Sequence, residues 1–499
     1  MYHASVFVRS LPVILFLNAV PATTVAAADI AESPQSLHAQ RSALPDPVNR
    51  VVQRYKLDPS SVSMVVQALD APEPVLSWNA DTPQNPASTI KTLTTLVALD
   101  VLTPGYYWKT YVYLDGTLSD GRLDGNLVLK GTGDPYLTTE NFWNLLRALR
   151  ARGLQHITGD LVVDNSYFEV AAEDPGAFDG EPFRSYNVAP DALLVNFKSV
   201  RFGFYPEPTG KGVRVVQDPL LANLRIDNRL AIKPGSCSGF QRGIAFNVPA
   251  GPEHDTVLFD GKFPSGCEEY SFSRTVLTPA QFAFGVFKGL WEELGGTIDG
   301  GVRVGLAPRA DESGLEPEPF HVHWSPTLAE VVRSINKYSN NVMTRHLLLT
   351  MGAKVYGAPG TEEKGRAVIA DWLKANHLEM PELILVNGAG LSRDTRISAA
   401  SMAALLRHAW NSPYMPEFVS SLPLSGMDGT LRRRFDDEPL VGQLHLKTGS
   451  MDDVAAIAGY ATSRSGRRYV VVDLHNEKDI HRGYGENVQD ALLHWVIAH

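Results

Sequence analysis

The spacing of apolar residues predicts three elements at the start of the chain. Residues 45–55 have the spacing of a helix, and residues 61–70 with 74–78 alternate as the two strands of a hairpin do. Apolar side chains then recur over 88–102, with no Gly or Pro before Pro104. An unbroken apolar segment of that length predicts a buried helix.

The middle of the chain has a different pattern. Between residues 106 and 279, short alternating runs are separated by Gly, Asp and Asn, which is typical of strands and turns. We expect strands at 108–114, 126–130, 161–164 and 212–216, and one helix at 140–153. This stretch is therefore predicted to be rich in β-structure.

Helical spacing returns after residue 279, and the chain closes with a further set of strands. We expect helices at 279–294, 327–351, 361–375, 398–410 and 484–497, and strands at 441–447, 455–462 and 467–475. Short connections favour an antiparallel sheet that the early hairpin joins and that helices cover. The predicted fold class is α+β, with a large β-rich insertion.

This pattern predicts the domain organisation of the 499 residues. We expect a catalytic domain made of residues 29–105 and 280–499, interrupted by an inserted β-rich region at 106–279 that forms two small domains. The first 28 residues are predicted to be a signal peptide, because the apolar run 11–20 follows Arg9 and precedes small residues around Ala28. The run is too short to span a bilayer, so we expect an exported, periplasmic protein without a transmembrane segment after cleavage.

Composition narrows the classes of function. A hydrophobic content of 44% and a charged content of 20% are typical of a folded globular protein. A net charge of -10 argues against nucleic acid as a partner, because phosphate contacts need clustered Lys and Arg. The two cysteines, Cys237 and Cys267, either form a disulfide in an exported chain or remain two buried thiols. The sequence leaves both possibilities open.

The first candidate for chemistry is Ser88 with Lys91 at the start of the buried helix. Residues three apart share a helix face, so the hydroxyl and the amine can meet. A desolvated neutral lysine can take the proton of a serine and make it a nucleophile. The same spacing recurs at Ser334 and Lys337, and a serine at this place can also be a plain helix N-cap.

Two further polar groups follow in the chain. Ser339 and Asn341 offer a hydroxyl and an amide two positions apart, a spacing that Ser334 and Asn336 also have. The run 447–450, composed of Lys447, Thr448, Gly449 and Ser450, stands at the end of a predicted strand, where an extended peptide can add to the sheet.

The order Ser-x-x-Lys, Ser-x-Asn, Lys-Thr-Gly resembles the penicillin-recognising serine enzymes. The long insertion between Ser88 and Ser339 resembles one branch of them, the class C low-molecular-mass penicillin-binding proteins, or peptidase family S13, which are D-Ala-D-Ala carboxypeptidases. Further segments are similar to that family: 131–135 (GTGDP), 186–187 (YN), 387–393 (NGAGLSR) and 428–431 (DGTL). The resemblance covers nearly the whole mature chain. Asn387 departs from it, because many members carry Asp or another residue there.

The resemblance implies a role for each motif residue. Ser88 is implied as the acylated nucleophile and Lys91 as its base, while Ser339 relays the proton to the leaving amine and Asn341 holds Lys91 and the substrate amide. The strand residues are implied as the substrate-binding set, with the backbone N–H groups of the first and last serine as an oxyanion hole: Lys447, Thr448, Gly449, Ser450.

The implied activity is cleavage of peptidoglycan stem peptides through an acyl-enzyme, as a carboxypeptidase, a D,D-endopeptidase or both, with β-lactams as covalent inhibitors and no cofactor or metal. The alternatives are a serine β-lactamase, a wall-binding protein without catalysis, and a zinc peptidase. The last is suggested by His321 and His323, which no His-Glu-x-x-His helix accompanies.

Overall fold

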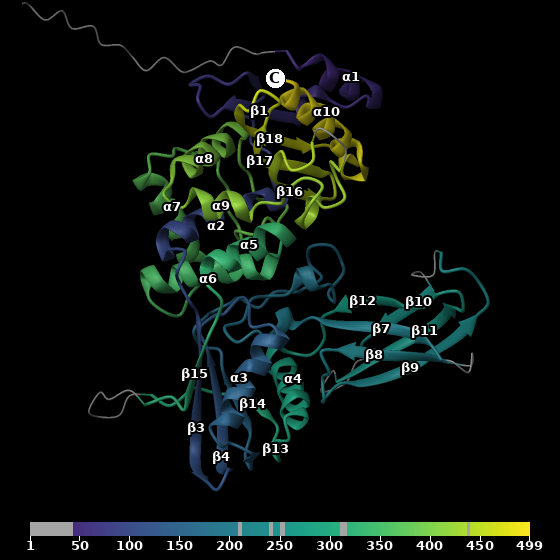
Figure 1. Cartoon of the computed structure of the whole chain (residues 1–499), viewed down its shortest axis with the longest axis vertical. Coiled ribbons are helices and arrows are strands. Elements are labelled where there is room, and N and C mark those ends of the chain that lie inside the picture. The colour runs from purple at the N-terminus through teal and green to yellow at the C-terminus, as the bar shows by residue number, and fades with distance from the viewer. Residues whose placement is uncertain (1–42, 208–211, 239–242, 250–254, 310–316, 437–439) are drawn as a thin grey trace, which may run out of the picture. The chain divides into compact units, whose positions relative to one another are not determined.

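The computed structural model describes residues 43–207, 212–238, 243–249, 255–309, 317–436 and 440–499. The predicted signal peptide at 1–28 lies outside these residues. The early and late parts of the chain share one antiparallel sheet, whose strand order is β16-β17-β18-β1-β2 (Figure 1). Its strands are β1 (Val62–Ala68), β2 (Leu76–Trp78), β16 (Leu444–Met451), β17 (Val454–Thr462) and β18 (Arg468–Asn476). The predicted hairpin and its place in this sheet are confirmed.

Helices cover both faces of the sheet. They are α1 (Asp46–Tyr55), α2 (Lys91–Leu102), α5 (Leu328–Tyr338), α6 (Asn341–Tyr356), α7 (Glu362–Ala375), α8 (Ala399–Asn411), α9 (Met415–Ser421) and α10 (Tyr484–Ala498). Successive residues of β17 point to opposite faces: Ala456 and Ala458 pack in the core that includes α2, and Ile457 packs in the core that includes α10. The sheet is therefore buried on both faces, and its apolar strands hold the two helical layers together.

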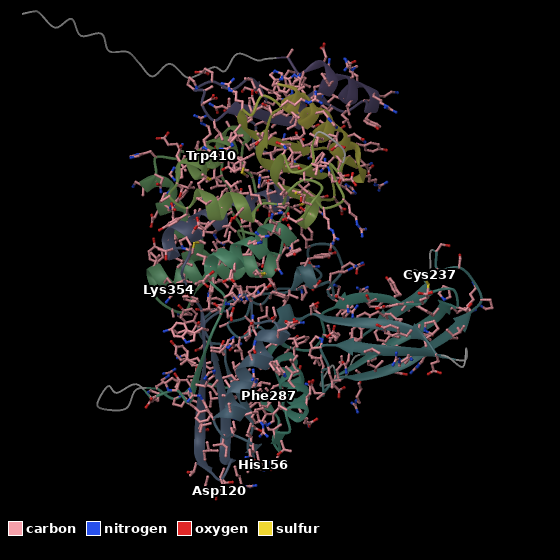
Figure 2. The ribbon with its side chains drawn as sticks, in the orientation of Figure 1. Asp120, His156, Cys237, Phe287, Lys354 and Trp410 are labelled. Carbon is pink, nitrogen blue, oxygen red and sulfur yellow. A yellow bond between two sulfur atoms is a disulfide. The ribbon has the colours of Figure 1, made fainter. Side chains whose placement is uncertain are left out.

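The inserted region contains a second sheet. It is built from β3 (Lys109–Ser119), β4 (Arg122–Gly131), β5 (His156–Ile157), β6 (Leu161–Asp164), β13 (Thr297–Ile298), β14 (Val302–Val304) and β15 (His321–Trp324). Helices α3 (Thr139–Ala151) and α4 (Pro279–Glu293) pack on it. Phe142 of α3 and Phe287 of α4, the latter labelled in Figure 2, lie in one hydrophobic core.

The rest of the insertion consists of two three-stranded sheets, with orders β10-β11-β9 and β12-β7-β8. Their strands are β7 (Val200–Pro206), β8 (Val213–Asp218), β9 (Arg225–Lys233), β10 (Ile244–Asn247), β11 (Thr256–Pro264) and β12 (Tyr270–Arg274). Phe202 of β7 and Phe259 of β11 pack edge to face between them. Cys237 and Cys267 form a disulfide with an S–S distance of 2.12 Å, which decides between the two alternatives left open by the sequence.

The strand pairing places the end of the insertion later in the chain than the sequence predicted. The sequence placed the return to the catalytic domain at residue 280, but β13, β14 and β15 pair with β5, β6 and β3. The signal was weak because β13 and β14 are very short and their partners lie far away in sequence. We therefore propose that the inserted region runs from residue 106 to 325 and consists of two small domains, one around each group of sheets.

A buried arginine joins the insertion to α6. The Arg345 side chain, only 7% exposed, places Nη1 2.6 Å from Oε1 of Glu173 and Nη2 2.8 Å from Oε1 of Glu362. Glu173 belongs to the insertion and Arg345 lies one helical turn beyond Asn341. This charge therefore anchors the segment that follows β6 against the first turns of α6.

We predict that Arg345→Met lowers the free energy of unfolding by about 3 kcal/mol, because it removes the cation that pairs with Glu173 and leaves Glu362 with only the longer contact to Arg366 at 3.7 Å. The control is Arg467→Ala. Arg467 forms an ion pair with Asp70, and the two side chains are 42% and 66% exposed. That change should cost about 1 kcal/mol or less. Equal losses in chemical denaturation would contradict the anchoring role of Arg345.

Candidate active site

Ser88 lies in a short 3-10 turn, η2 (Ala87–Ile90), that leads into α2. The sequence predicted one helix over 88–102, and the structure shows that the first turn of this helix is a 3-10 turn. Lys91 is the first residue of α2, and its Nζ lies 2.8 Å from Ser88 Oγ. The two groups meet as the three-residue spacing predicted.

The Lys91 amine has two more neighbours, and both can only accept hydrogen bonds. Its Nζ lies 2.7 Å from Asn341 Oδ1 and 2.5 Å from the carbonyl oxygen of Ala389. A neutral amine has two N–H groups and one lone pair. When the two N–H groups donate to these oxygens, the lone pair points toward the Ser88 hydroxyl, as a base for that proton requires.

The surroundings favour the neutral amine. Lys91 is fully buried, and this desolvation, helped by the nearby positive charge of Lys447, holds its pKa well below that of a free lysine. Burial alone lowers the pKa of Lys447 to about 7. The charge of Lys447 therefore contributes to the low pKa of Lys91, but its effect is second to burial.

The amide of Asn341 has a fixed orientation. Its Nδ2 donates to the carbonyl oxygen of Tyr186 at 3.1 Å, so its Oδ1 faces Lys91. Tyr186 lies in η3 (Ser185–Asn187) of the insertion, and Asp179 holds this turn by accepting from Tyr186 Oη at 2.6 Å and from Asn187 Nδ2 at 2.9 Å. The insertion thus contributes to the position of a motif residue.

Ser339 lies at the break between α5 and α6. It takes the left-handed conformation that ends α5, with φ of 57°, and Asn340 caps α6 by accepting from the backbone N–H of Met343. The sequence predicted helical structure over 327–351 and left the position of this motif on or between helices. The structure places it between two helices, in a turn that directs Ser339 toward β16.

Lys447, Thr448, Gly449 and Ser450 lie within β16, at the edge of the sheet, and not at the end of a strand as expected. The prediction ended this strand at residue 447 because Thr-Gly-Ser resembles a turn. Lys447 Nζ lies 2.9 Å from Ser339 Oγ and 2.7 Å from the carbonyl oxygen of Thr448. This lysine therefore links the edge strand to the turn between α5 and α6.

The edge strand passes very close to the turn that carries Ser88. A Cβ added to Gly449 would lie 2.6 Å from the carbonyl oxygen of Pro86 and 3.0 Å from the backbone nitrogen of Ser88. Only a glycine allows this approach without displacement. It brings the backbone N–H of Ser88 beside β16, as a paired oxyanion hole with Ser450 requires.

The site contains a cavity of about 310 Å³. Ser88, Ser339, Asn341 and Ser450 line it, together with residues from the insertion, the 387–393 segment and the end of β16: Phe178, Asp179, Tyr186, Gly390, Leu391, Arg393, Met451, Asp452. The cleft thus joins the predicted serine nucleophile to groups from four other parts of the chain.

The competing matches in the sequence lie elsewhere. Lys337, the partner of Ser334 in the second Ser-x-x-Lys, pairs with Asp428 at 2.7 Å. Asn336 is buried and donates to Ser421 Oγ at 2.8 Å. Both therefore serve packing around α5, away from the cavity.

Comparison with known proteins decides the family. The model of the D-Ala-D-Ala carboxypeptidase 3 (S13) family matches residues 45–498. The chain belongs to this S13 family. It is a serine-type D-Ala-D-Ala carboxypeptidase or D,D-endopeptidase of the penicillin-binding class, and the resemblance carried by the three motifs is confirmed.

S13 relatives match along most of the chain. The chain is 26% identical over 440 residues to a D-alanyl-D-alanine carboxypeptidase of Actinomadura sp., which covers 86% of this chain and 80% of the relative. It is 24% identical over 429 residues to the carboxypeptidase DacB of Haemophilus influenzae, which covers 84% and 85%. The crystal structure of penicillin binding protein 4 from Haemophilus influenzae superposes with a TM-score of 0.75 at 22% identity, over 91% and 99% of the two chains. The α+β fold expected from the sequence is confirmed.

Several site groups could not be found from the motifs. The carbonyl of Ala389 is a backbone atom, and its only signal is the flanking pair Gly388 and Gly390, both with positive φ. Asp179 had no signal, although Tyr186 stood in a segment that resembled the family.

The zinc alternative has no support in the described ranges. His321 and His323 lie in β15, which pairs with β3. Burial lowers the pKa of His323 to about 4. Among residues 43–499 outside the gaps, no group of three or more His, Cys, Asp or Glu side chains could hold a metal ion.

We predict that Gly390→Ala slows penicillin acylation at least about tenfold, because small displacements of a reacting group are costly. The added Cβ would lie 1.9 Å from the carbonyl oxygen of Ala87, next to Ser88. Gly466→Ala is the matched control: its φ is 81° against 78° for Gly390, but nothing lies within 4 Å of its added Cβ. The control should lose about 1 kcal/mol of stability and retain acylation. Stopped-flow acylation rates and thermal unfolding of both variants test this.

Proposed function

We propose that Ser88 is the nucleophile of this S13 enzyme and Lys91 its general base. The contact between Lys91 Nζ and Ser88 Oγ carries the proposal, because it joins a fully buried amine of lowered pKa to a hydroxyl at the cavity wall. Lys91 takes the proton of Ser88 as Oγ attacks the carbonyl carbon of the penultimate D-alanine. The backbone N–H groups of Ser88 and Ser450 stabilise the negative oxygen that forms.

The second half of the site handles the leaving group. The proton taken by Lys91 returns through the Ser339 hydroxyl to the leaving nitrogen, so the C–N bond breaks as the amine becomes neutral. Ser339 accepts from Lys447, which leaves its own O–H free to donate. Lys447 and Thr448 bind the terminal carboxylate, and Asn341 holds the substrate amide. Water then hydrolyses the ester on Ser88.

The natural substrate in this proposal is the stem peptide of peptidoglycan. A free terminal D-alanine makes the reaction a carboxypeptidase reaction, and a cross-linked stem makes it an endopeptidase reaction. β-Lactams acylate Ser88 in the same way. The penicillin binding protein 4 of Haemophilus influenzae has been solved in complex with a β-lactam, and that structure superposes on this chain with a TM-score of 0.70.

The proposed location is the periplasm, after removal of residues 1–28. The apolar run near the N-terminus supports export, and the Cys237–Cys267 disulfide is of the kind that persists in oxidising compartments. In the ranges that the structure describes, no helix is both long and apolar enough to cross a membrane.

We predict that a fluorescent penicillin labels the mature protein once and that Ser88→Ala abolishes the label, because only the Ser88 hydroxyl can form the ester. Intact mass measures the adduct, and thermal unfolding shows that the variant is folded. A folded wild type that stays unlabelled would favour the wall-binding alternative. An adduct that is hydrolysed within seconds, with turnover of free penicillin, would favour a β-lactamase.

We predict a bell-shaped pH dependence of kcat/KM for a peptide that ends in D-Ala-D-Ala. Activity should fall toward low pH as Lys91 becomes protonated, and the lowered pKa of Lys91 puts this limb below the range of a free lysine. It should fall again above about pH 7, where Lys447, with a pKa of about 7, loses the charge that attracts the carboxylate. The same peptide with a terminal carboxamide should lose the alkaline limb and keep the acidic one. An alkaline limb of equal size for both peptides would contradict the role of Lys447.

A further inference from the structure

We propose that Thr430 is an additional substrate-binding residue, whose hydroxyl joins that of Thr448 in holding the free carboxylate at the end of the substrate. The proposal rests on the proposed function, which places this carboxylate at Lys447 and Thr448. Thr430 lies in the 3-10 turn η6 (Gly429–Leu431), outside the three motifs.

The position of Thr430 continues a row of hydroxyls along the edge strand. Thr448 and Ser450 are two residues apart in β16, so their side chains point to the same face. Ser450 lines the cavity that contains Ser88. Oγ1 of Thr430 lies 2.8 Å from Oγ1 of Thr448, so it adds a third hydroxyl to this pair.

The chemistry of the pair suits a carboxylate. When two hydroxyls contact each other, one donates and the other accepts, and at least one O–H remains for another acceptor. A carboxylate has two oxygens that only accept, so it can accept from this remaining O–H, and from both threonines when the hydrogen bond between them is exchanged for the ligand. The Lys447 ammonium lies nearby, with its Nζ 2.7 Å from the carbonyl oxygen of Thr448. Thr430 is exposed, so a ligand can reach its hydroxyl.

The turn that carries Thr430 is held by a shielded ion pair. Lys337, whose side chain is 6% exposed, places Nζ 2.8 Å from Asp428 Oδ1 and 2.6 Å from the carbonyl oxygen of Leu422. The same Oδ1 accepts from the backbone N–H of Leu424 at 2.8 Å. Asp428 precedes η6 directly, so these contacts fix where the turn begins.

A glycine brings this turn against α5. Gly429 has a φ of 57°, and a Cβ added to it would lie 2.6 Å from the carbonyl oxygen of Lys337. Lys337 is two residues before Ser339 at the end of the same helix. The end of α5 therefore positions both Ser339, which contacts Lys447, and Thr430, which contacts Thr448.

The test compares Thr430→Val, which keeps the shape and removes the hydroxyl, with Thr430→Ser, which keeps the hydroxyl. Steady-state kinetics of the mature protein are measured on a tripeptide ending in D-Ala-D-Ala with a free carboxylate and on its carboxamide. A second pair is penicillin and its methyl ester, followed by acylation rate. A lost hydrogen bond to a charged group corresponds to a loss of about tenfold or more.

We expect Thr430→Val to lower kcat/KM about tenfold for the free carboxylate, mainly through KM, and less than about twofold for the carboxamide. Acylation by penicillin should slow about tenfold, as for the free carboxylate, and acylation by its methyl ester should change less than about twofold, as for the carboxamide. Thr430→Ser should behave as the wild type with all four compounds. An equal loss on both members of each pair would overturn the proposal, because a residue that only supports Thr448 or the fold affects both. An unchanged Thr430→Val would overturn it as well.

Thr448→Val separates this outcome from a failure of the proposed function. If Thr448→Val discriminates between carboxylate and carboxamide and Thr430→Val does not, the carboxylate site stands and Thr430 is not part of it. If neither variant discriminates while Ser88→Ala still abolishes labelling, the carboxylate lies elsewhere, and both Thr430 and the proposed role of Thr448 are wrong.

Discussion

The desolvated amine of Lys91 is the constraint on which the rest of the site depends. A buried lysine is stable only when its polar amine has partners. Here Ser88 comes from the same helical turn, and Asn341 and the carbonyl of Ala389 come from two distant segments. The neutral amine that burial favours is also the form that can accept a proton. The cost of burying Lys91 and its proposed activity as a base therefore have the same physical origin.

Close backbone approach is the means by which these segments meet. Gly390 brings the Ala389 carbonyl against the turn of Ser88, and Gly449 brings β16 against the same turn from another side. At both positions a Cβ would overlap a backbone oxygen. The sheet and the helix behind Ser88 provide rigidity, and the glycines provide the proximity that a rigid site requires.

Local sequence patterns predicted where helices and strands form better than they predicted which strands pair and which residues are in contact. The buried helix after Ser88 and the strands of the main sheet follow from apolar spacing. The order of three polar motifs predicted the family, which is confirmed, and Ser88 as the nucleophile, which stays a prediction. The end of the insertion was misplaced because the pairing of β13 to β15 is non-local. Ala389 and Thr430 lie in two segments that resembled the family, but the sequence does not show which atoms they contact. Ala389 contacts Lys91 through a backbone carbonyl, and Thr430 contacts Thr448 across 18 residues.

The insertion helps to fix the geometry of the proposed catalytic site, because it contacts the start of α6 at several points. Tyr186 orients the amide of Asn341, Glu173 pairs with Arg345, and the backbone N–H of Asp191 donates to Nε2 of His346 at 3.3 Å. These contacts fall on the first two turns of the helix whose first residue holds Lys91. The contact between Tyr186 and Asn341 therefore links the position of the insertion to the hydrogen bond between Asn341 and Lys91, and so to the orientation of the amine beside Ser88.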